Sequence, residues 1–366
     1  MKRVLFISPY MGRTGSESAV LQIINNCTQI QPALYSGQKG DLLNEVKSGI
    51  PVFINPLINI NKNRVQKINN KLGIKTPFEK YLDKIQKDFN PDLWLLNTLV
   101  NKDVLKYIQK FNLNFAVWSH ELFSSFENIS GFDLKYIIDN AKFIIGCSMQ
   151  VCKQFEKVGS KNVNLFYETI EISKINKFFN SAANNKKEIG QYKYLFVMSG
   201  QKGYRKGFHY VPIIAEKLKK ENSALIWIGR SNEYGLEALI TEQLKCLNLT
   251  NVIFTGEQST DYYNWLNLGD YFILTSIEDA YPLVMLEAAY LQKPIISFDS
   301  GGVGEFVKEG MGKVVPLFDV NSLYNAIDDI IQGRINIDKT LLRSEAEKHD
   351  IRIQVNRFEN IILKNI

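Results

Sequence analysis

The sequence predicts an α/β protein of two domains, each a parallel sheet with helices on both faces. Three observations predict this. The chain has 366 residues, which is enough for two domains of ordinary size. Short apolar segments of strand length alternate along it with amphipathic segments of helical length. A polar stretch at residues 180–191 lacks hydrophobic periodicity and is predicted to link the two domains.

The first domain is predicted to span residues 1–185 and to open with a strand at residues 2–9. A loop containing Gly15 and Ser16 follows, and it leads into a helix whose first turn can accept a phosphate or a sugar. The loop lacks the full three-glycine pattern of a dinucleotide site, so we do not expect NAD to bind. Further strands are expected at residues 51–55, 92–97, 115–119, 143–146 and 163–167, with helices between them at 79–89 and 104–111.

The second domain is predicted to span residues 192–345 and to open with a strand at 194–198. The loop after this strand contains Gly200, Arg205 and Lys206, and a helix follows it. Glycines and two adjacent cations before a helix are typical of a diphosphate site, although a solvated basic turn is the alternative. Later strands are expected at residues 224–229, 252–255, 271–274 and 295–298, followed by amphipathic helices.

The most informative stretch is residues 275–316, which reads as an acidic loop, a helix, a strand and a glycine loop. Glu278 and Asp279 lie in the acidic loop, at the carboxyl end of a strand where ligands usually bind. Pro282 suits the first turn of the helix, and Glu287 lies within it. A carboxylate accepts two hydroxyl hydrogen bonds at once, so Glu287 is suited to hold a ribose diol.

Ordered motifs in this stretch resemble those of the retaining glycosyltransferases of family 4. Asp279 and Glu287 have that family's spacing of two acids, within the context Pro-Leu-Val-Met-Leu-Glu-Ala. The later motifs Gly-Gly-x-x-Glu at 301–305 and Gly-x-Gly-Lys-Val-Val-Pro at 310–316 match as well. The resemblance implies the GT-B fold: two Rossmann-like domains facing across a cleft, with a final helix at residues 346–366 crossing back onto the first domain. The family usually has Glu at the first acidic position, which leaves open whether Glu278 or Asp279 contacts the donor sugar.

The resemblance also implies which residues act. His120, at the end of the strand 115–119, matches a family histidine near the donor sugar, with a packed loop histidine as the alternative. The family's phosphate-binding Arg is replaced here by Gln201, so we expect Arg205 to supply the guanidinium. The implied catalytic residues are His120, Glu278, Asp279, Arg205 and Lys206. The implied donor-binding residues are Gly15, Ser16, Gly200, Arg205, Lys206, Arg230, Glu257, Ala280, Tyr281, Pro282, Leu283 and Glu287.

The implied reaction is transfer of a sugar, with retention, from a nucleotide-diphosphate sugar to a hydroxyl acceptor. A UDP-sugar is favoured as donor, a GDP-sugar is possible, and no separate cofactor is implied. The acceptor is expected to be a glycan or a lipid-linked saccharide in bacterial surface polysaccharide or glycolipid assembly. The sequence has no Asp-x-Asp motif or zinc-type cysteine spacing, so a metal-independent mechanism and no metal site are expected. A GT-B epimerase and a non-catalytic nucleotide- or glycan-binding protein remain alternatives.

Composition and charge suggest a cellular location and a binding partner for the protein. The sequence has no run of about eighteen uninterrupted apolar residues and no signal-peptide layout, and four cysteines are expected to stay reduced in the cytoplasm. The net charge of +6 comes from an excess of Lys and Arg within residues 1–190. An anionic inner membrane face suits that excess better than nucleic acid, for which no motif is present; a solvated Lys-rich surface is the alternative. Residues 59–76 are predicted to face the membrane or the acceptor.

Overall fold

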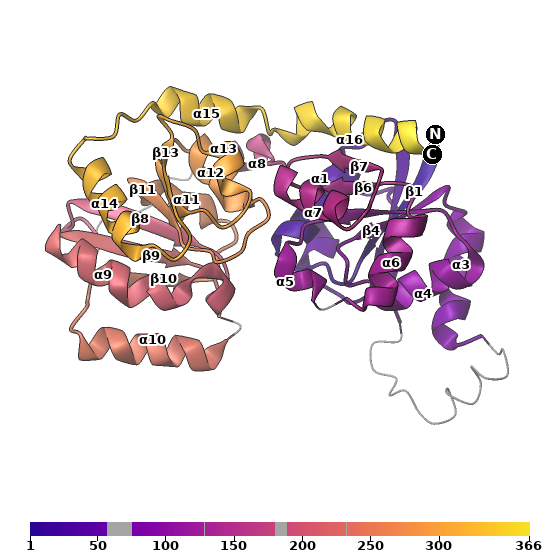
Figure 1. Ribbon diagram of the computed structural model, residues 1–366, viewed down its shortest axis with the longest axis horizontal. Helices are drawn as coiled ribbons and strands as arrows, with labels where there is room; N and C mark the ends of the chain where they lie inside the picture. Colours follow the sequence, from indigo (N-terminus) through magenta and orange to yellow (C-terminus); the bar gives the residue numbers. More distant parts are fainter. Residues whose placement is uncertain (57–74, 128, 180–188, 232) are drawn as a thin grey trace. The chain divides into compact units, whose positions relative to one another are not determined.

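The computed structural model describes residues 1–56, 75–127, 129–179, 189–231 and 233–366 (Figure 1). The chain forms two compact units, one comprising Met1–Glu168 with Ile351–Ile366 and the other Thr169–Asp350. Each unit contains one parallel sheet, so the prediction of a two-domain, Rossmann-like α/β fold is confirmed. Among the described residues, no helix is long and apolar enough to cross a membrane. Most of the stretch predicted to face the membrane or the acceptor, residues 59–76, lies outside the described part, which leaves out residues 57–74.

The first unit is built on a seven-stranded sheet in the order β3-β2-β1-β4-β5-β6-β7. Strands β4 and β5 are buried along their whole length, as expected for central strands of a parallel sheet covered on both faces. The strands are β1 (Lys2–Ser8), β2 (Ile30–Ser36), β3 (Val52–Ile54), β4 (Leu93–Asn97), β5 (Phe115–Ser119), β6 (Ile144–Gly146) and β7 (Val163–Leu165).

Helices connect these strands, and several begin at side-chain caps. Thr76 and Glu79 form a reciprocal capping box at the start of α3, and Ser148 caps α7 through the amide of Val151. The helices of this unit are α1 (Gly15–Asn26), α3 (Pro77–Phe89), α4 (Lys102–Phe111), α5 (Phe123–Phe126), α6 (Gly131–Asn140), α7 (Met149–Lys157) and α16 (Ile351–Asn365), with a short 3-10 helix, η1 (Asp41–Glu45).

Helix α16, the last of the chain, packs in the first unit beside α1 (Figure 1). Its apolar face, including Phe358, is buried in the core of that unit. Glu359 is fully buried, and its Oε1 accepts backbone N–H bonds from Gln29 at 2.6 Å and Ile30 at 3.0 Å. A carboxylate bonded to several amides is well compensated for burial. The predicted return of the final helix to the first domain is therefore confirmed, although the helix begins at Ile351.

The second unit is built on a six-stranded sheet in the order β10-β9-β8-β11-β12-β13. The order reverses between β8 and β11, which is where parallel sheets of this kind open a crevice at their carboxyl edge. The strands are β8 (Tyr194–Ser199), β9 (Ser223–Ile228), β10 (Val252–Gly256), β11 (Tyr271–Leu274), β12 (Ile295–Phe298) and β13 (Gly312–Val315).

Helix α8 lies at the start of the second unit, so the two units divide earlier in the chain than predicted. Ile172 and Ile175 of this helix are buried, and the helix packs on α11. The two units divide at Glu168–Thr169, before the predicted linker at residues 180–191, of which residues 180–188 are outside the described part. The helices are α8 (Ile172–Phe179), α9 (Val211–Lys220), α10 (Tyr234–Cys246), α11 (Tyr262–Leu268), α12 (Leu283–Tyr290), α13 (Val303–Phe306), α14 (Val320–Ile331) and α15 (Lys339–Glu347), with 3-10 turns η3 (Tyr204–Lys206) and η4 (Phe208–Tyr210).

Candidate functional site

A basic loop in the second unit joins β8 to α9 and is held against the end of β11. Gly207 makes this approach possible, because it has a φ of +74° and a Cβ there would lie 2.1 Å from the carbonyl oxygen of Thr275. The amide of Ile277 donates to the carbonyl oxygen of Arg205 at 2.8 Å. The loop that carries the two predicted cations is thereby joined, backbone to backbone, to the segment that carries the two predicted acids.

The structure brings four of the predicted site residues together at this point. Lys206 Nζ forms an ion pair with Asp279 Oδ2, which also accepts a hydrogen bond from Ser276 Oγ at 3.0 Å. Arg205 Nη1 donates to the backbone oxygen of Glu278 at 3.0 Å. Asp279 is thus held by its neighbours, whereas Glu278 takes part here through its main chain.

Charge is unevenly balanced within this group. Burial lowers the pKa of Lys206 and the nearby Arg205 guanidinium lowers it further, so the attraction of Asp279 only partly restores it. Burial would raise the pKa of Asp279, but Lys206 and Arg205 lower it below its ordinary value. The carboxylate stays ionised beside two cationic side chains. Two cationic side chains beside one buried carboxylate suit an anionic ligand.

Glu287, predicted to hold a ribose diol, lies on α12 and accepts two phenolic hydrogen bonds. Tyr262 Oη donates to Oε2 at 2.9 Å and Tyr263 Oη donates to Oε1 at 3.1 Å. Tyr262 is also 3.2 Å from Ser199 Oγ at the end of β8. Burial raises the pKa of Glu287 to about 7, even though both tyrosines lower it. Neither tyrosine was predicted as a site residue, because no sequence motif surrounds them and only their hydroxyl groups distinguish them from apolar aromatic residues.

The remaining residues of the predicted donor site differ in exposure. Ala280 and Tyr281 are buried, and Tyr281 packs on Phe306 and on His349, whose Nε2 lies 3.4 Å from Tyr281 Oη. The side chain of Tyr281 is therefore part of the interior, and a ligand would meet the backbone of this segment. Pro282 precedes α12, Leu283 begins it, and Gly200 follows β8 with a φ of +145°.

Arg230 and Glu257 follow the neighbouring strands β9 and β10 and form an exposed pair. Arg230 Nη1 lies 3.4 Å from Glu257 Oε2, and the two side chains are 44% and 42% exposed. An exposed pair of this kind contributes little to stability. The structure thus places both residues at the same edge of the sheet as the basic loop, but the charge of Arg230 is already matched.

In the first unit, His120 is held between two acceptors. One ring nitrogen, Nδ1, lies 2.5 Å from Glu168 Oε1, and the other, Nε2, lies 2.8 Å from Asn97 Oδ1. Asn97 uses its Nδ2 to donate to the backbone oxygen of Ser16, so its oxygen faces the ring. Two acceptors require a donor on each ring nitrogen, so the geometry favours the imidazolium form.

Electrostatics agrees with this protonation state. Burial would lower the pKa of His120, but the charge and hydrogen bond of Glu168 raise it above its ordinary value. Two further carboxylates, Glu121 and the buried Glu17, act in the same direction. His120 is therefore neither an ordinary packed histidine nor an exposed one, but a buried cation among three acids.

Gly15 and Ser16, also predicted to bind the donor, form the first residues of α1. Ser16 Oγ donates to Glu17 Oε2 at 3.0 Å, and the Ser16 backbone oxygen accepts from Asn97. The start of α1 is thereby connected through Asn97 to His120. The sequence analysis singled out Ser16 and His120, and the residue that links them, Asn97, was missed because its amide side chain has no motif around it.

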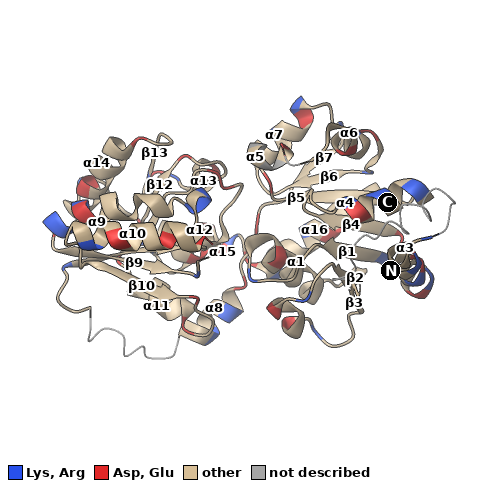
Figure 2. Ribbon diagram, turned by 90° about the horizontal axis from the view of Figure 1, so that it is seen from below, with Lys and Arg blue, Asp and Glu red and all other residues tan. Residues whose placement is uncertain are grey.

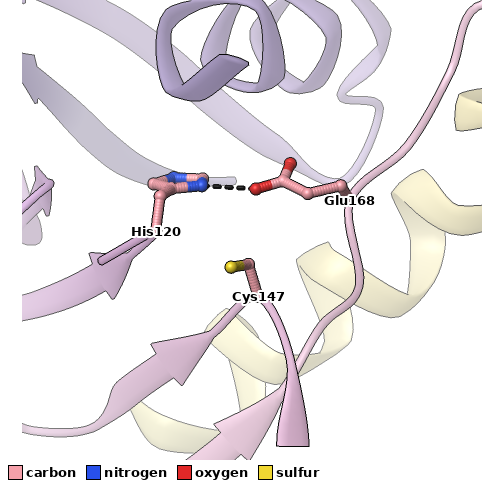
Figure 3. A group of neighbouring side chains, drawn as sticks. All are labelled: His120, Cys147 and Glu168. Carbon is pink, nitrogen blue, oxygen red and sulfur yellow. Dashed lines mark hydrogen bonds and ion pairs between the residues drawn. The ribbon is translucent and has the colours of Figure 1, made fainter. Parts of the chain in front are cut away.

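One grouping of side chains has no counterpart in the sequence motifs. Among the described residues, His120, Cys147 and Glu168 present ligand atoms that all lie within 4.8 Å of one another (Figure 3). Such a set has the composition of a metal site. The cysteine spacing gave no sign of this grouping, because the three residues are far apart in sequence and only the order of the strands brings them together.

Comparison with known proteins identifies relatives of both the sequence and the fold. Residues 180–349 match the family model described as Glycosyl transferases group 1. No curated protein matches the chain. Among solved structures, Alr3699/HepE of Anabaena, in complex with UDP and glucose, has a TM-score of 0.80 at 18% identity, with both chains fully covered.

Two further structures are similar over nearly the same length. The lipopolysaccharide outer core galactosyltransferase WaaB, in its apo form, has a TM-score of 0.72 at 16% identity and full coverage of both chains. A sucrose-phosphate synthase of Thermosynechococcus elongatus has a TM-score of 0.70 at 17% identity, covering 100% of this chain and 97% of its own. At these identities the likeness shows the fold.

Proposed function

We propose that this protein, whose residues 180–349 match the model of the group 1 glycosyltransferases, transfers a sugar from a UDP-sugar to an acceptor hydroxyl. The observation that carries this proposal is the joining of the basic loop to the acidic loop through Lys206 and Asp279. That contact leaves Arg205 exposed at the carboxyl edge of the sheet. A positive group in this position suits the diphosphate of a nucleotide-sugar.

Departure of the nucleotide leaves negative charge on the diphosphate, which the cations of the basic loop would stabilise. Arg205 uses one N–H on the backbone of Glu278 and has further donors for phosphate oxygens. Lys206 adds a second positive charge next to it. Removal of one such donor to a developing anion typically costs about 2.7–4 kcal/mol of barrier, so Arg205 is assigned a large share of the catalysis.

The ribose of the donor would be held by Glu287. Its carboxylate has about four lone-pair positions, two of which accept from Tyr262 and Tyr263. The other two are sufficient for a diol. Because the pKa of Glu287 is raised to about 7, protonation below that pH replaces an acceptor by a donor. We therefore expect donor affinity to fall as the pH drops below neutrality.

The sugar ring acquires positive character as the nucleotide departs, and the acids around His120 suit that charge. In the proposed reaction His120 contacts the donor sugar, and Glu17, Glu121 and Glu168 supply a negative field around it. The proton of the acceptor hydroxyl passes to the leaving phosphate, and the new bond forms on the face that the nucleotide leaves. Retention and metal independence belong to this proposal and are supported by the family resemblance.

The acceptor proposed is a glycan or lipid-linked saccharide of a bacterial cell surface. One structural relative is a lipopolysaccharide galactosyltransferase. Helix α3 of the first unit carries Lys80, Lys84 and Lys87, all exposed and at helical spacing, with the exposed Asp88 beside them. Figure 2 shows blue and red together on this helix. The lysines would favour an anionic membrane, and the proposed location is the cytoplasmic face.

A ligand-binding and turnover experiment tests the proposal. UDP at a hundred times its Kd should stabilise the protein by about 2.7 kcal/mol, and GDP, ADP and CMP should do so less. Arg205→Ala should lower turnover of the identified UDP-sugar by about 100–1000-fold, whereas Lys220→Ala, at an exposed position on α9, should leave it unchanged.

The outcomes separate the rival functions. Product that forms only when an acceptor saccharide is present supports transfer. Inversion of the configuration at one carbon of the donor sugar, without an acceptor, indicates an epimerase. UDP binding with no turnover of any UDP-sugar across an acceptor panel indicates a non-catalytic binding protein. Full activity of Arg205→Ala contradicts the assignment of the diphosphate to the basic loop.

A further inference from the structure

The cluster of His120, Cys147 and Glu168 lies at the carboxyl ends of three adjacent strands. His120 directly follows β5, Cys147 directly follows β6, and Glu168 lies three residues after β7. These strands are neighbours in the sheet, paired Ser119 with Gly146 and Gly146 with Leu165. The amide of Cys147 also donates to the backbone oxygen of Ser119 at 3.2 Å. The pairing of the strands therefore determines the backbone positions from which these side chains project.

The three side chains present the donor atoms that zinc prefers. An imidazole nitrogen, a sulfur and a carboxylate oxygen lie within 4.8 Å of one another, and the side chains converge in Figure 3. Zinc binds such atoms at about 2.0–2.3 Å, so two donors on one tetrahedral ion lie about 3.3–3.8 Å apart. The 2.5 Å contact between His120 and Glu168 needs to open by about 1 Å for an ion to enter.

The surroundings of the cluster already have two features of a metal site, burial of the ligands and a hydrogen-bond partner for the histidine. Cys147 is 1% exposed and Glu168 is 4% exposed, so both donors already lie away from solvent. The second ring nitrogen of His120 faces Asn97 Oδ1 at 2.8 Å. Metal-binding histidines usually donate their other ring N–H to a carbonyl or carboxylate oxygen, which sets the tautomer and orients the ring. Asn97 supplies that contact here before any ion is bound.

We propose that a zinc ion binds between His120, Cys147 and Glu168, and that zinc bound there inhibits the protein. Zinc takes the place of one proton on the imidazolium and one on the thiol, so the net charge of the buried cluster is conserved. Three protein ligands leave the fourth position of the ion to water or another small ligand. A metal-bound His120 can no longer act as the buried cation among acids that the proposed reaction uses. The inhibition rests on the proposed function, whereas the binding does not.

Zinc and cobalt binding by purified protein test the site directly. All proteins carry Cys246→Ser, which removes an exposed thiol. Competition with a chromophoric chelator should show tight binding of one zinc ion, and Co²⁺ should give a thiolate-to-cobalt charge-transfer band with tetrahedral d–d absorption. Cys147→Ser should abolish the band and weaken zinc binding by more than the roughly 100-fold that loss of an outer partner costs.

Cys152→Ser is the matched control, because Cys152 is the next cysteine in the chain and its Sγ contacts the backbone oxygens of Gly146 and Asn164. It should bind both metals like the parent protein. Equal zinc affinity in the parent and Cys147→Ser, or an equal loss in Cys152→Ser, overturns the site. X-ray absorption at the zinc edge of the parent protein decides the question without a variant: one sulfur ligand among nitrogen and oxygen ligands supports it, and none contradicts it.

Activity measurements address the inhibition separately. Zinc should inhibit sugar transfer by the parent and by Cys152→Ser at the concentration that fills the site, and excess chelator should restore it. If zinc binds to the cluster with no loss of transfer, the inhibitory role is wrong while the metal site stands. If the protein transfers no sugar under any condition, the proposed function fails, and the cobalt spectrum still tests the site.

Discussion

The His120–Glu168 pair of the first unit and the Lys206–Asp279 pair of the second are both buried acid–base pairs at the carboxyl edge of a parallel sheet. Their surroundings differ in sign. Carboxylates surround His120, and its pKa is raised although burial alone would lower it. Arg205 lies beside Lys206, and burial and that neighbour lower the pKa of the lysine. The surroundings of the first pair thus favour its cation, whereas burial and Arg205 disfavour the cation of the second pair despite the attraction of Asp279.

This difference indicates what each region is prepared to bind. An excess of negative charge favours a ligand or transition state with positive character, and an excess of positive charge favours an anion. Glycosyl transfer from a nucleotide-sugar produces both, an electron-poor sugar ring and an anionic diphosphate. Each region therefore suits one of the two charges of the proposed reaction. Changing one pair at a time tests this division.

The largest effect is expected from Lys206→Met, which removes the ammonium and keeps the apolar stem. Asp279, which is 8% exposed, would then be a buried carboxylate without its main partner. Breaking a buried pair in this way typically costs about 3–5 kcal/mol. We expect the free energy of unfolding of the second unit to fall by about 3 kcal/mol, measured by urea denaturation.

The double variant Lys206→Met with Asp279→Asn is the control for that measurement. It removes both charges, so most of the lost stability should return, while UDP binding should remain impaired. A single variant as stable as the parent contradicts the view that the pair is a buried charge pair. A double variant that still binds UDP normally contradicts the positive region as the diphosphate site.

The sequence predicted the second region better than the first, for a physical reason. Arg205, Lys206, Glu278 and Asp279 each follow a strand in a motif of local spacing, and Gly207 brings the two loops together. Such groups can be read from short stretches of sequence. The alternation of strands and helices likewise gave the two sheets, because burial on both faces produces apolar runs.

The cluster around His120 has no local signal. Asn97 ends β4, Cys147 follows β6 and Glu168 follows β7, so their proximity to His120 depends on the order β4-β5-β6-β7. Cysteine spacing could not indicate this cluster, since such spacing detects only ligands that lie close together in sequence. Helix α8 was assigned to the wrong side of the division because its packing partner, α11, lies far along the chain.

An intermediate effect is expected from Glu168→Gln, observed through the histidine ring resonances in a pH titration by NMR in chelator-treated buffer. The chain has three histidines. Loss of the nearest countercharge should lower the pKa of His120 by about one to three units. Since the parent pKa is raised, the pair stabilises the parent below about pH 6.5, and this stabilisation disappears as the pH rises through the raised value. Glu168→Gln should lose most of that dependence.

His209 is an internal control for the titration. Its pKa is lowered by burial, and it lies in the second unit, so its resonance should not move in Glu168→Gln. His120→Gln assigns the His120 signal by removing it, which distinguishes that signal from those of His209 and His349. An unshifted His120 resonance in Glu168→Gln would show that the acids near His120 do not control its charge, and the comparison between the two regions would fail.

The smallest effect is expected from Arg230→Ala, which tests where the positive region ends. Arg230 pairs with Glu257 at 3.4 Å and both side chains are more than a third exposed, so the pair contributes about 1 kcal/mol or less. Its loss should change UDP affinity by no more than about fivefold, with the difference vanishing at high salt. Isothermal titration calorimetry of Arg230→Ala, Glu257→Gln and Arg205→Ala measures this. An arginine whose charge is already matched by Glu257 should contribute less to UDP binding than Arg205 does. If Arg230→Ala nevertheless weakens UDP binding as much as Arg205→Ala, the positive region that binds UDP extends from the basic loop to the end of β9.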